Sequence, residues 1–343
     1  MEQTLTPPQA AAPQVRLWLN FIAFLVFCMV IVGGATRLTD SGLSITEWQP
    51  LLGAIPPLNE ADWLAAFGKY KLIPEYQIQN KGMELGDFKI IYWWEWAHRF
   101  LGRFIAVAFA IPLVYFSVTR KLATRLWPRF FALFVLGGAQ GALGWYMVSS
   151  GLNDRVDVSQ YRLAAHLTLA ALIFAAIIWV AKGIGALRRY PSSLDDWFAV
   201  LLVVFIFLQI AAGGFVAGID AGQGYATWPK MDGQWIPSGL MNMVPGWKNV
   251  FENAMTVQFN HRLLAYLILL AAIIHAWRSF TLTAMILAYA VFAQACLGIL
   301  TLLLNVQLAV ALVHQAGAMI VLAVAVWNLH SQLIIQSPAP DPQ

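Results

Sequence analysis

The sequence predicts an all-α polytopic membrane protein, with eight transmembrane helices arranged as two pseudo-symmetric four-helix bundles. Three observations lead to this prediction. The chain has 343 residues, of which 60% are hydrophobic and only 11% are charged, whereas a soluble domain carries about 25% charged residues. Long uncharged apolar runs recur along the chain. The pattern of glycine, aspartate, tryptophan and proline residues at 33–57 also returns 180 positions later.

The lengths of the apolar runs define the spans, since a helix needs about 20 apolar residues to cross the hydrocarbon. Two runs reach that length only if they extend back through the His-Arg pairs at 98–99 and 261–262. The uncharged stretch 279–340 is too long for one helix, and we expect a break near 305–307. The predicted spans are 17–35, about 98–118, 130–150, 163–181, 197–219, about 261–277, 281–304 and 308–329.

Basic residues in the short loops set the orientation. They gather in the loops 119–129 and 182–189, with one more at Arg278. Because short cytoplasmic loops carry an excess of Lys and Arg, we expect both termini in the cytoplasm and the long loops, about 38–95 and 218–257, outside. The formal net charge of +4 then reflects membrane orientation, and nothing in the sequence indicates a nucleic-acid partner.

The two ends of the chain, 1–16 and 331–343, are predicted to be cytoplasmic tails. The first has neither the basic segment and apolar core of a signal peptide nor the Arg- and Ser-rich composition of a transit peptide. We therefore expect a multi-pass protein of a bacterial inner membrane.

An internal duplication relates the two halves. Shifting residues 33–57 by 180 positions aligns seven identities, several of them Gly, Pro or Trp. The His-Arg pair at 98–99 matches the pair at 261–262, and the segment from Gln140 to Gly144 matches that from Gln294 to Gly298. Four spans in each half give both the same topology, as in parallel repeats. The predicted units are an N-terminal bundle, 17–181, a linker, 182–196, and a C-terminal bundle, 197–330.

Four histidines, His98, His166, His261 and His314, lie near the outer ends of the even-numbered spans, one pair in each half. An ionisable side chain inside a membrane is expensive and therefore functional by default. A single such histidine is more often a packing residue, but four at duplicated positions favour ligation. Two imidazoles from facing helices, without thiolates and among aromatic residues, suit haem iron better than zinc or copper. The sequence therefore predicts two bis-histidine haem sites.

Two further histidines and the two cysteines have no pattern that indicates a ligand role. His275 and His330 lie near the cytoplasmic ends of their spans, where we expect interfacial side chains. Cys28 and Cys296 lie inside apolar stretches and are expected to be small buried residues.

The two halves differ three residues before their first histidine, where Glu95 in the first half corresponds to Gln258 in the second. Residues i and i+3 share a helix face, so this side chain would point toward the same haem as the ligand. A carboxylate can accept a proton or stabilise a developing cation. The first site is therefore predicted to be the reaction centre, and the second to hold a permanent redox cofactor. The alternative is a surface ion pair between Glu95 and Arg99.

Arg99 and Arg262 directly follow the first histidine of each half. They have two interpretations, as partners of haem propionates or as ordinary arginines that extend to the interface. The sequence leaves both open.

Four segments resemble the haem A synthase family: Gly-Gly-Ala-Thr-Arg-Leu-Thr-Asp-Ser-Gly-Leu-Ser at 33–44, Trp-Glu-Trp-Ala-His-Arg-Phe-Leu-Gly-Arg at 94–103, Gln-Phe-Asn-His-Arg at 258–262 and Val-His-Gln at 313–315. The resemblance covers about 17–330. It implies an eight-helix, internally duplicated enzyme that oxidises a methyl group of haem O to a formyl group, through an alcohol, for terminal oxidases.

By this resemblance, His261 and His314 bind haem b, His98 and His166 lie at the haem O site, and Glu95 is important for activity. Some members carry a cysteine pair in an outer loop of the first half. This chain has none there and resembles the cysteine-free type of proteobacteria and mitochondria.

The expected partners are haem O, the enzyme that supplies it, an electron acceptor of unspecified identity and membrane lipid, and a homo-oligomer is compatible with the sequence. The main rival function is a di-haem b electron-transfer protein resembling quinol oxidoreductases, with both haems permanent. A transporter with structural histidines also fits parallel repeats, but it would bind no haem.

Overall fold

The computed structural model describes residues 11–49, 52–152, 155–186 and 189–334. Its regular elements are helical in all these segments, apart from an isolated bridge between Met231 and Gln234. The spanning helices are α2 (Ala12–Leu38), α5 (Leu85–Val118), α6 (Trp127–Val148), α7 (Gln160–Lys182), α8 (Leu194–Gly218), α10 (Ala254–Ser279), α11 (Leu282–Leu303) and α12 (Leu308–Gln332). These eight helices are long and apolar enough to cross a membrane, so the predicted fold class is confirmed.

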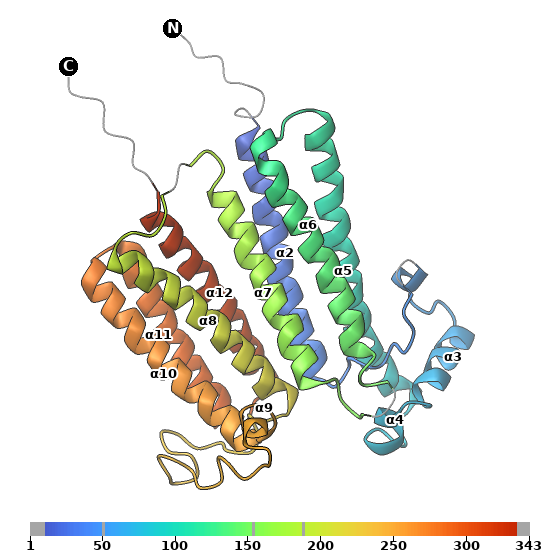
Figure 1. Ribbon diagram of the computed structural model, residues 1–343. Helices are drawn as coiled ribbons and strands as arrows, with labels where there is room; N and C mark the ends of the chain where they lie inside the picture. The colour runs from blue at the N-terminus through green and yellow to red at the C-terminus, as the bar shows by residue number, and fades with distance from the viewer. Residues whose placement is uncertain (1–10, 50–51, 153–154, 187–188, 335–343) are drawn as a thin grey trace, which may run out of the picture.

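Shorter helices lie in the two long loops. They are α3 (Glu60–Tyr70), α4 (Pro74–Ile78) and α9 (Asn249–Glu252), with single 3₁₀ turns at 52–54, 124–126 and 246–248. α2 begins and α12 ends at the same end of the molecule, as an even number of spans requires (Figure 1). The helical residues 12–16 belong to α2 and not to a tail. Residues 1–10 and 335–343, which include most of both predicted tails, lie outside the described residues.

One predicted boundary was wrong by a wide margin. α5 begins at Leu85, thirteen residues before His98, so this histidine lies well inside its helix and not at its start. The charges of segment 85–97 concealed the helix from a search for uncharged runs. Phe88, Ile91 and Tyr92 are spaced i, i+3 and i+4, and this buried stripe packs against α3.

The extension of α5 holds a compact outer layer in place. Trp63 and Phe67 on α3 lie 4.9 Å, between ring centroids, from Tyr92 and Phe88 respectively. Side-chain capping by Asn59 fixes the start of α3. Trp63 is therefore a core residue of this layer, while Trp48, in the same long loop, is exposed.

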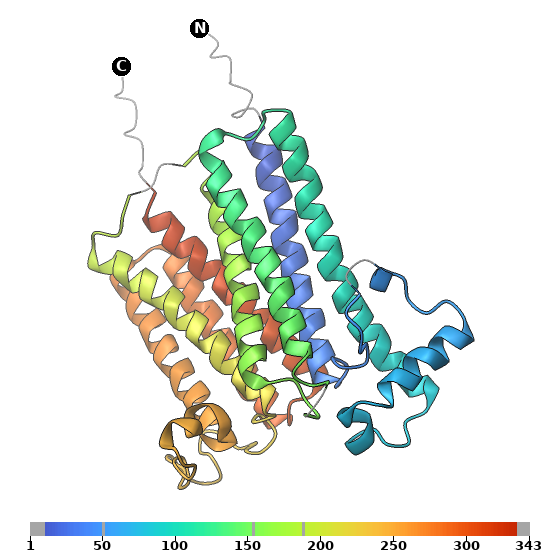
Figure 2. The same cartoon turned by 45° about the vertical axis from the view of Figure 1, so that its right-hand side comes forward.

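The spans form two groups that lie side by side (Figures 1 and 2). In the first, α2 packs on α5 and α7, and α6 packs on α7; in the second, α8, α10, α11 and α12 pack in a ring. The groups meet where α2 and α7 contact α12 and where α7 contacts α8. These central helices carry most of the large apolar core, whereas α5, α6 and α11 present much of their surface outward.

Candidate functional site

Each of the four predicted histidines lies against a glycine of the spanning helix before it. The glycines are Gly33 for His98, Gly144 for His166, Gly213 for His261 and Gly298 for His314. A Cβ atom built on them would lie 2.8, 2.9, 3.3 and 2.9 Å from the imidazole Cε1. Any larger residue would therefore displace the ring. All four rings are half-buried.

The two members of each pair come together in space. His98 on α5 and His166 on α7 lie within electrostatic range of each other, as do His261 on α10 and His314 on α12. The structure therefore builds two matched pairs, one in each bundle, from residues far apart in sequence.

A glutamine one turn before the glycine supports three of the four histidines. Gln140, Gln209 and Gln294 donate Nε2–H to the backbone carbonyls of His166, His261 and His314, at 3.1, 3.1 and 2.8 Å. Each Nε2 also lies within 3.3 Å of a ring nitrogen of the same histidine. The Oε1 atoms of all three are buried and have no hydrogen-bond partner within the described residues. The internal repeat aligned Gln140 with Gln294, but the sequence alone gave neither residue a role and did not single out Gln209.

This arrangement fits a haem iron. An imidazole that binds a metal through one nitrogen almost always donates the other N–H to an acceptor, and a glutamine amide at the ring nitrogen can present its oxygen there by turning over. Within the described segments, no three His, Cys, Asp or Glu side chains converge on one point. Each site thus supplies two imidazoles and lacks the further protein ligands of a structural zinc site.

Glu95 lies in a buried hydrogen-bond network and not on the helix surface. Its Oε2 accepts from the Ser44 hydroxyl at 2.8 Å and from the Ile45 N–H at 2.6 Å. Its Oε1 accepts from Arg99 Nη2 at 2.6 Å and Nε at 3.0 Å, and only 2% of the residue is exposed. The alternative pairing with Arg99 is therefore present, but in the interior. At the matching position, Gln258 donates to the carbonyl of Ala221 at 2.8 Å.

The two arginines clamp equivalent loops. Arg99 donates to the carbonyls of residues 45 and 47, and Arg262 to those of residues 225 and 227, at 2.7–2.9 Å in each case. Arg262 also donates to Gln258 Oε1 at 2.8 Å. The two loops differ by the same 180 positions as the aligned glycines. These matched contacts support the duplication and give both arginines a role in holding the outer loops, while their pairing with propionates stays a prediction.

The glycine pairs at 33–34 and 213–214 also join the two halves. A Cβ on Gly34 would overlap Gln315, whose side chain donates to the carbonyl of Val30 at 2.8 Å. Correspondingly, a Cβ on Gly214 would lie 2.8 Å from the Cα of Ala164 on α7. The first glycine of each pair thus faces its own bundle's histidine, and the second faces the other bundle.

An ionic cluster that the sequence pattern did not indicate lies where the two halves meet, at the end of the spans opposite the termini. Arg37 at the end of α2 contacts Asp40 and Asp220 at 2.9 Å and Asp157 at 3.5 Å. It also donates to the carbonyl of Ala217 at 3.1 Å. The guanidinium is therefore shared between both bundles and the loop before α7.

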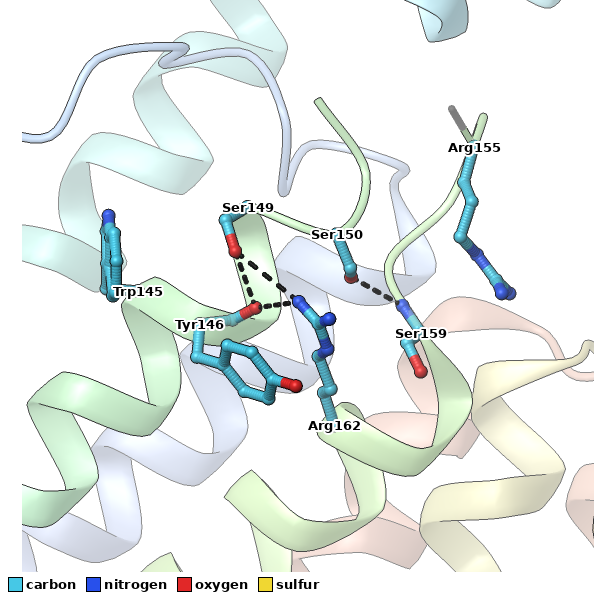
Figure 3. A pocket seen from close by; sticks show the side chains of 7 residues that line it. All are labelled: Trp145, Tyr146, Ser149, Ser150, Arg155, Ser159 and Arg162. Carbon is cyan, nitrogen blue, oxygen red and sulfur yellow. Dashed lines mark hydrogen bonds between the residues drawn. The ribbon is translucent and has the colours of Figure 1, made fainter. Parts of the chain in front are cut away.

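Two pockets open at the same end of the spans. One, of about 580 Å³, lies between the end of α6 and the start of α7, with Arg162 donating to the carbonyl of Tyr146 and to Ser149 (Figure 3). Trp145 lines this pocket and directly follows Gly144, the glycine that contacts His166. The other, of about 480 Å³, is lined by 155–157 and 218–220. Both lie just outside the histidine pairs.

The remaining candidate residues are structural. His275 and His330 are buried and not interfacial: His275 Nε2 lies 3.0 Å from Asn328 Nδ2, and the ring of His330 lies 5.4 Å from that of Trp179. Neither Cys28 nor Cys296 forms a disulfide. Cys296 is exposed, so the expectation that it is buried was wrong.

Comparison with known proteins agrees with this geometry. The cytochrome oxidase assembly protein family matches residues 16–326. A haem A synthase of Parvibaculum lavamentivorans is 55% identical over 322 residues, 92% of this chain and 93% of its own length. The chain belongs to the haem A synthase family. Haem A synthases of Azorhizobium caulinodans and Bradyrhizobium diazoefficiens are 54% and 47% identical, over 93% and 99% of this chain and 94% and 97% of their own lengths. All four histidines and Glu95 fall within the family match.

Proposed function

We propose that this chain makes haem A by oxidising a methyl group of haem O to a formyl group, through an alcohol. Membership of the haem A synthase family supports an enzyme of haem A formation. The difference between the two histidine sites carries the assignment of roles: Glu95 stands beside His98, where Gln258 stands beside His261. Haem O is assigned to the N-terminal site and haem b to the C-terminal site.

The histidine pairs hold the two macrocycles. His98 and His166 would hold the substrate iron, and His261 and His314 that of haem b. The glycines beside the rings let helix backbone and imidazole approach closely, and the glutamines support three of the four rings. Bound haem b supplies a one-electron couple that accepts electrons removed from the substrate.

Glu95 acts as a fixed negative charge near the reacting methyl group. Both of its oxygens already accept hydrogen bonds from the protein, and proton uptake would break one of these. The role that this geometry favours is therefore stabilisation of positive charge as the methyl group is oxidised. Each of the two steps, methyl to alcohol and alcohol to hydrated aldehyde, takes up one water molecule and releases two electrons and two protons, and loss of water from the hydrate then gives the formyl group.

The pocket of Figure 3 is a candidate for the propionate side of the substrate. Arg155 and Arg162 both line it, and guanidinium groups pair well with carboxylates. Arg162 lies one helical turn before His166, while the residue one turn before His314 is Val310. A cationic group at this position is thus particular to the proposed substrate site, and it supplements Arg99 and Arg262 as a propionate partner.

The chain is a multi-pass membrane protein. We place it in a bacterial inner membrane with both termini in the cytoplasm, because the basic loops lie at the end opposite the histidine pairs.

Acid extraction and chromatography of the haems that copurify with the full chain, from a host that makes haem O, test the proposal. Haem B together with haem O, the alcohol or haem A is the expected result. Haem B alone, at two per chain, would contradict it and favour the di-haem electron-transfer protein.

A further inference from the structure

The fourth histidine, His98, lacks the glutamine that supports the other three. Under the 180-residue shift, the counterpart of Gln209 is Met29, four residues before Gly33. A thioether has no N–H to donate and is only a weak acceptor. Nδ1 of His98 is correspondingly buried without a hydrogen-bond partner among the described residues.

A second substitution accompanies the methionine. The residue four positions after each glutamine-supported histidine is alanine, at Ala170, Ala265 and Ala318, but after His98 it is Gly102. A Cβ on Gly102 would lie 3.0 Å from the terminal methyl group of Met29. Met29 and Gly102 therefore lie together, and the corresponding positions at the other three sites are glutamine and alanine.

The N-terminal bundle is also open beside this histidine. In the C-terminal bundle, α10 and α11 pack along each other, whereas their counterparts α5 and α6 barely touch. Among the described residues of α6, the buried ones are Phe130 and Leu133, both near its beginning. The second half of α6, which carries Gly144 against His166, therefore has no buried residue.

We propose that His98 is the exchangeable ligand of the N-terminal site. Its ring is held by packing on Gly33 and not by an amide, so it can leave the iron and let one haem depart and another enter. His166 stays fixed by Gln140. The C-terminal site, with a glutamine on both ligands, retains its haem. Met29 and Gly102 are thus positioning residues for substrate exchange, and this inference rests on the proposed function.

Haem release from the full-length protein tests the proposal without measuring catalysis. The purified protein, loaded with haem B at both sites, is mixed with excess apomyoglobin, and haem transfer is followed by absorbance. The parent should release haem in a fast and a slow phase, with H98A removing the fast one. Since a supporting group beside a metal ligand is typically worth 10–100-fold in affinity, M29Q should slow the fast phase at least tenfold and leave the slow phase unchanged.

Two further variants separate the amide from side-chain size. M29L, which has no amide, should keep the parent's fast phase. M29Q/G102A restores the complete Gln-Ala pair and covers the case in which glutamine alone packs poorly. The reverse change, Q209M/A265G, should make the slow phase about tenfold faster. Fast-phase rates within twofold of the parent in both M29Q and M29Q/G102A would overturn the role of Met29. Absence of a histidine-ligated haem spectrum at the N-terminal site would instead contradict the proposed function itself.

Discussion

Replacing Glu95 with glutamine removes one charge and one hydrogen bond that the carboxylate accepts. The amide can still accept from Arg99 through its oxygen, but its NH₂ group then faces the N–H of Ile45, which now lies 2.6 Å from a carboxylate oxygen. Flipping the amide does not help, because both carboxylate oxygens face donors. An unpaired buried N–H costs about 1–3 kcal/mol, and hydrogen bonds to charged groups are worth about 1.5–3 kcal/mol against about 1 for neutral ones. The local network should thus weaken by about 2–4 kcal/mol.

We expect E95Q to lower the rate of haem A formation at least about 100-fold, which corresponds to about 2.7 kcal/mol of lost transition-state stabilisation. The haem b spectrum should persist, since His261 and His314 lie in the other bundle. The assay is chromatography of extracted haems over time, with the reduced-minus-oxidised spectrum recorded on the same sample. Unchanged formation of haem A would refute the role of Glu95.

A matched control separates the charge from the network. S44A removes one donor to Glu95 but keeps the carboxylate and its contacts with Ile45 and Arg99. Loss of one hydrogen bond to a charged group, worth about 1.5 kcal/mol where the carboxylate keeps its other donors, predicts a reduction of about tenfold. Equal losses in S44A and E95Q would mean that Glu95 serves to hold the outer loop and not to stabilise charge.

Three further predictions concern other parts of the molecule. G298A should displace the His314 ring, because the new Cβ would lie 2.9 Å from Cε1, and should lower haem b content in pyridine haemochrome assays, whereas G137A, with no neighbour within 4 Å, should not. R37Q leaves three aspartates around a neutral side chain and should lower the melting temperature by an amount corresponding to about 1 kcal/mol, since the aspartates are partly exposed; an equal effect in 0.5 M salt would contradict this explanation. Burial raises the pKa of Glu75 in the outer layer to about 8 from 4.5, so the folded layer binds a proton that the unfolded chain releases, and its stability should fall from about pH 4.5 to pH 8; E75Q should flatten this profile in pH-dependent thermal melts, while E47Q, on the exposed surface, should not.

The spans and histidines were predictable because each depends on a local property of the sequence. A run of apolar residues long enough to cross a bilayer has few alternatives, and a histidine within such a run is conspicuous. The start of α5 was missed for the same reason: Asp87 and Lys89 interrupt the apolar run, although Asp87 is exposed and the Lys89 ammonium group lies 5.3 Å from the ring centroid of Trp63. Hydrophobic periodicity, rather than absence of charge, is the signal that would have found it.

The supporting glutamines were harder to find because their spacing from the histidines varies. Gln140, Gln209 and Gln294 precede their histidines by 26, 52 and 20 residues, since the connecting loops differ in length. What stays constant is the four-residue step from glutamine to glycine on one helix. Only the packing of neighbouring helices shows that this step faces a histidine.

The departures from the internal repeat converge on one ligand. Glu95 replaces the glutamine of the second half three residues before His98, Met29 replaces the glutamine that would support its ring, and Gly102 replaces the alanine one turn later. The first change adds a charge beside the site, and the other two remove a support. A catalytic site whose substrate is a haem needs both properties, because the macrocycle must react there and then leave. A site for a permanent haem needs neither, and around His261 the C-terminal bundle has Gln258, Gln209 and Ala265. Exchanging all three residues between the halves, as E95Q/M29Q/G102A and Q258E/Q209M/A265G, should therefore move the rapidly released haem from the first site to the second.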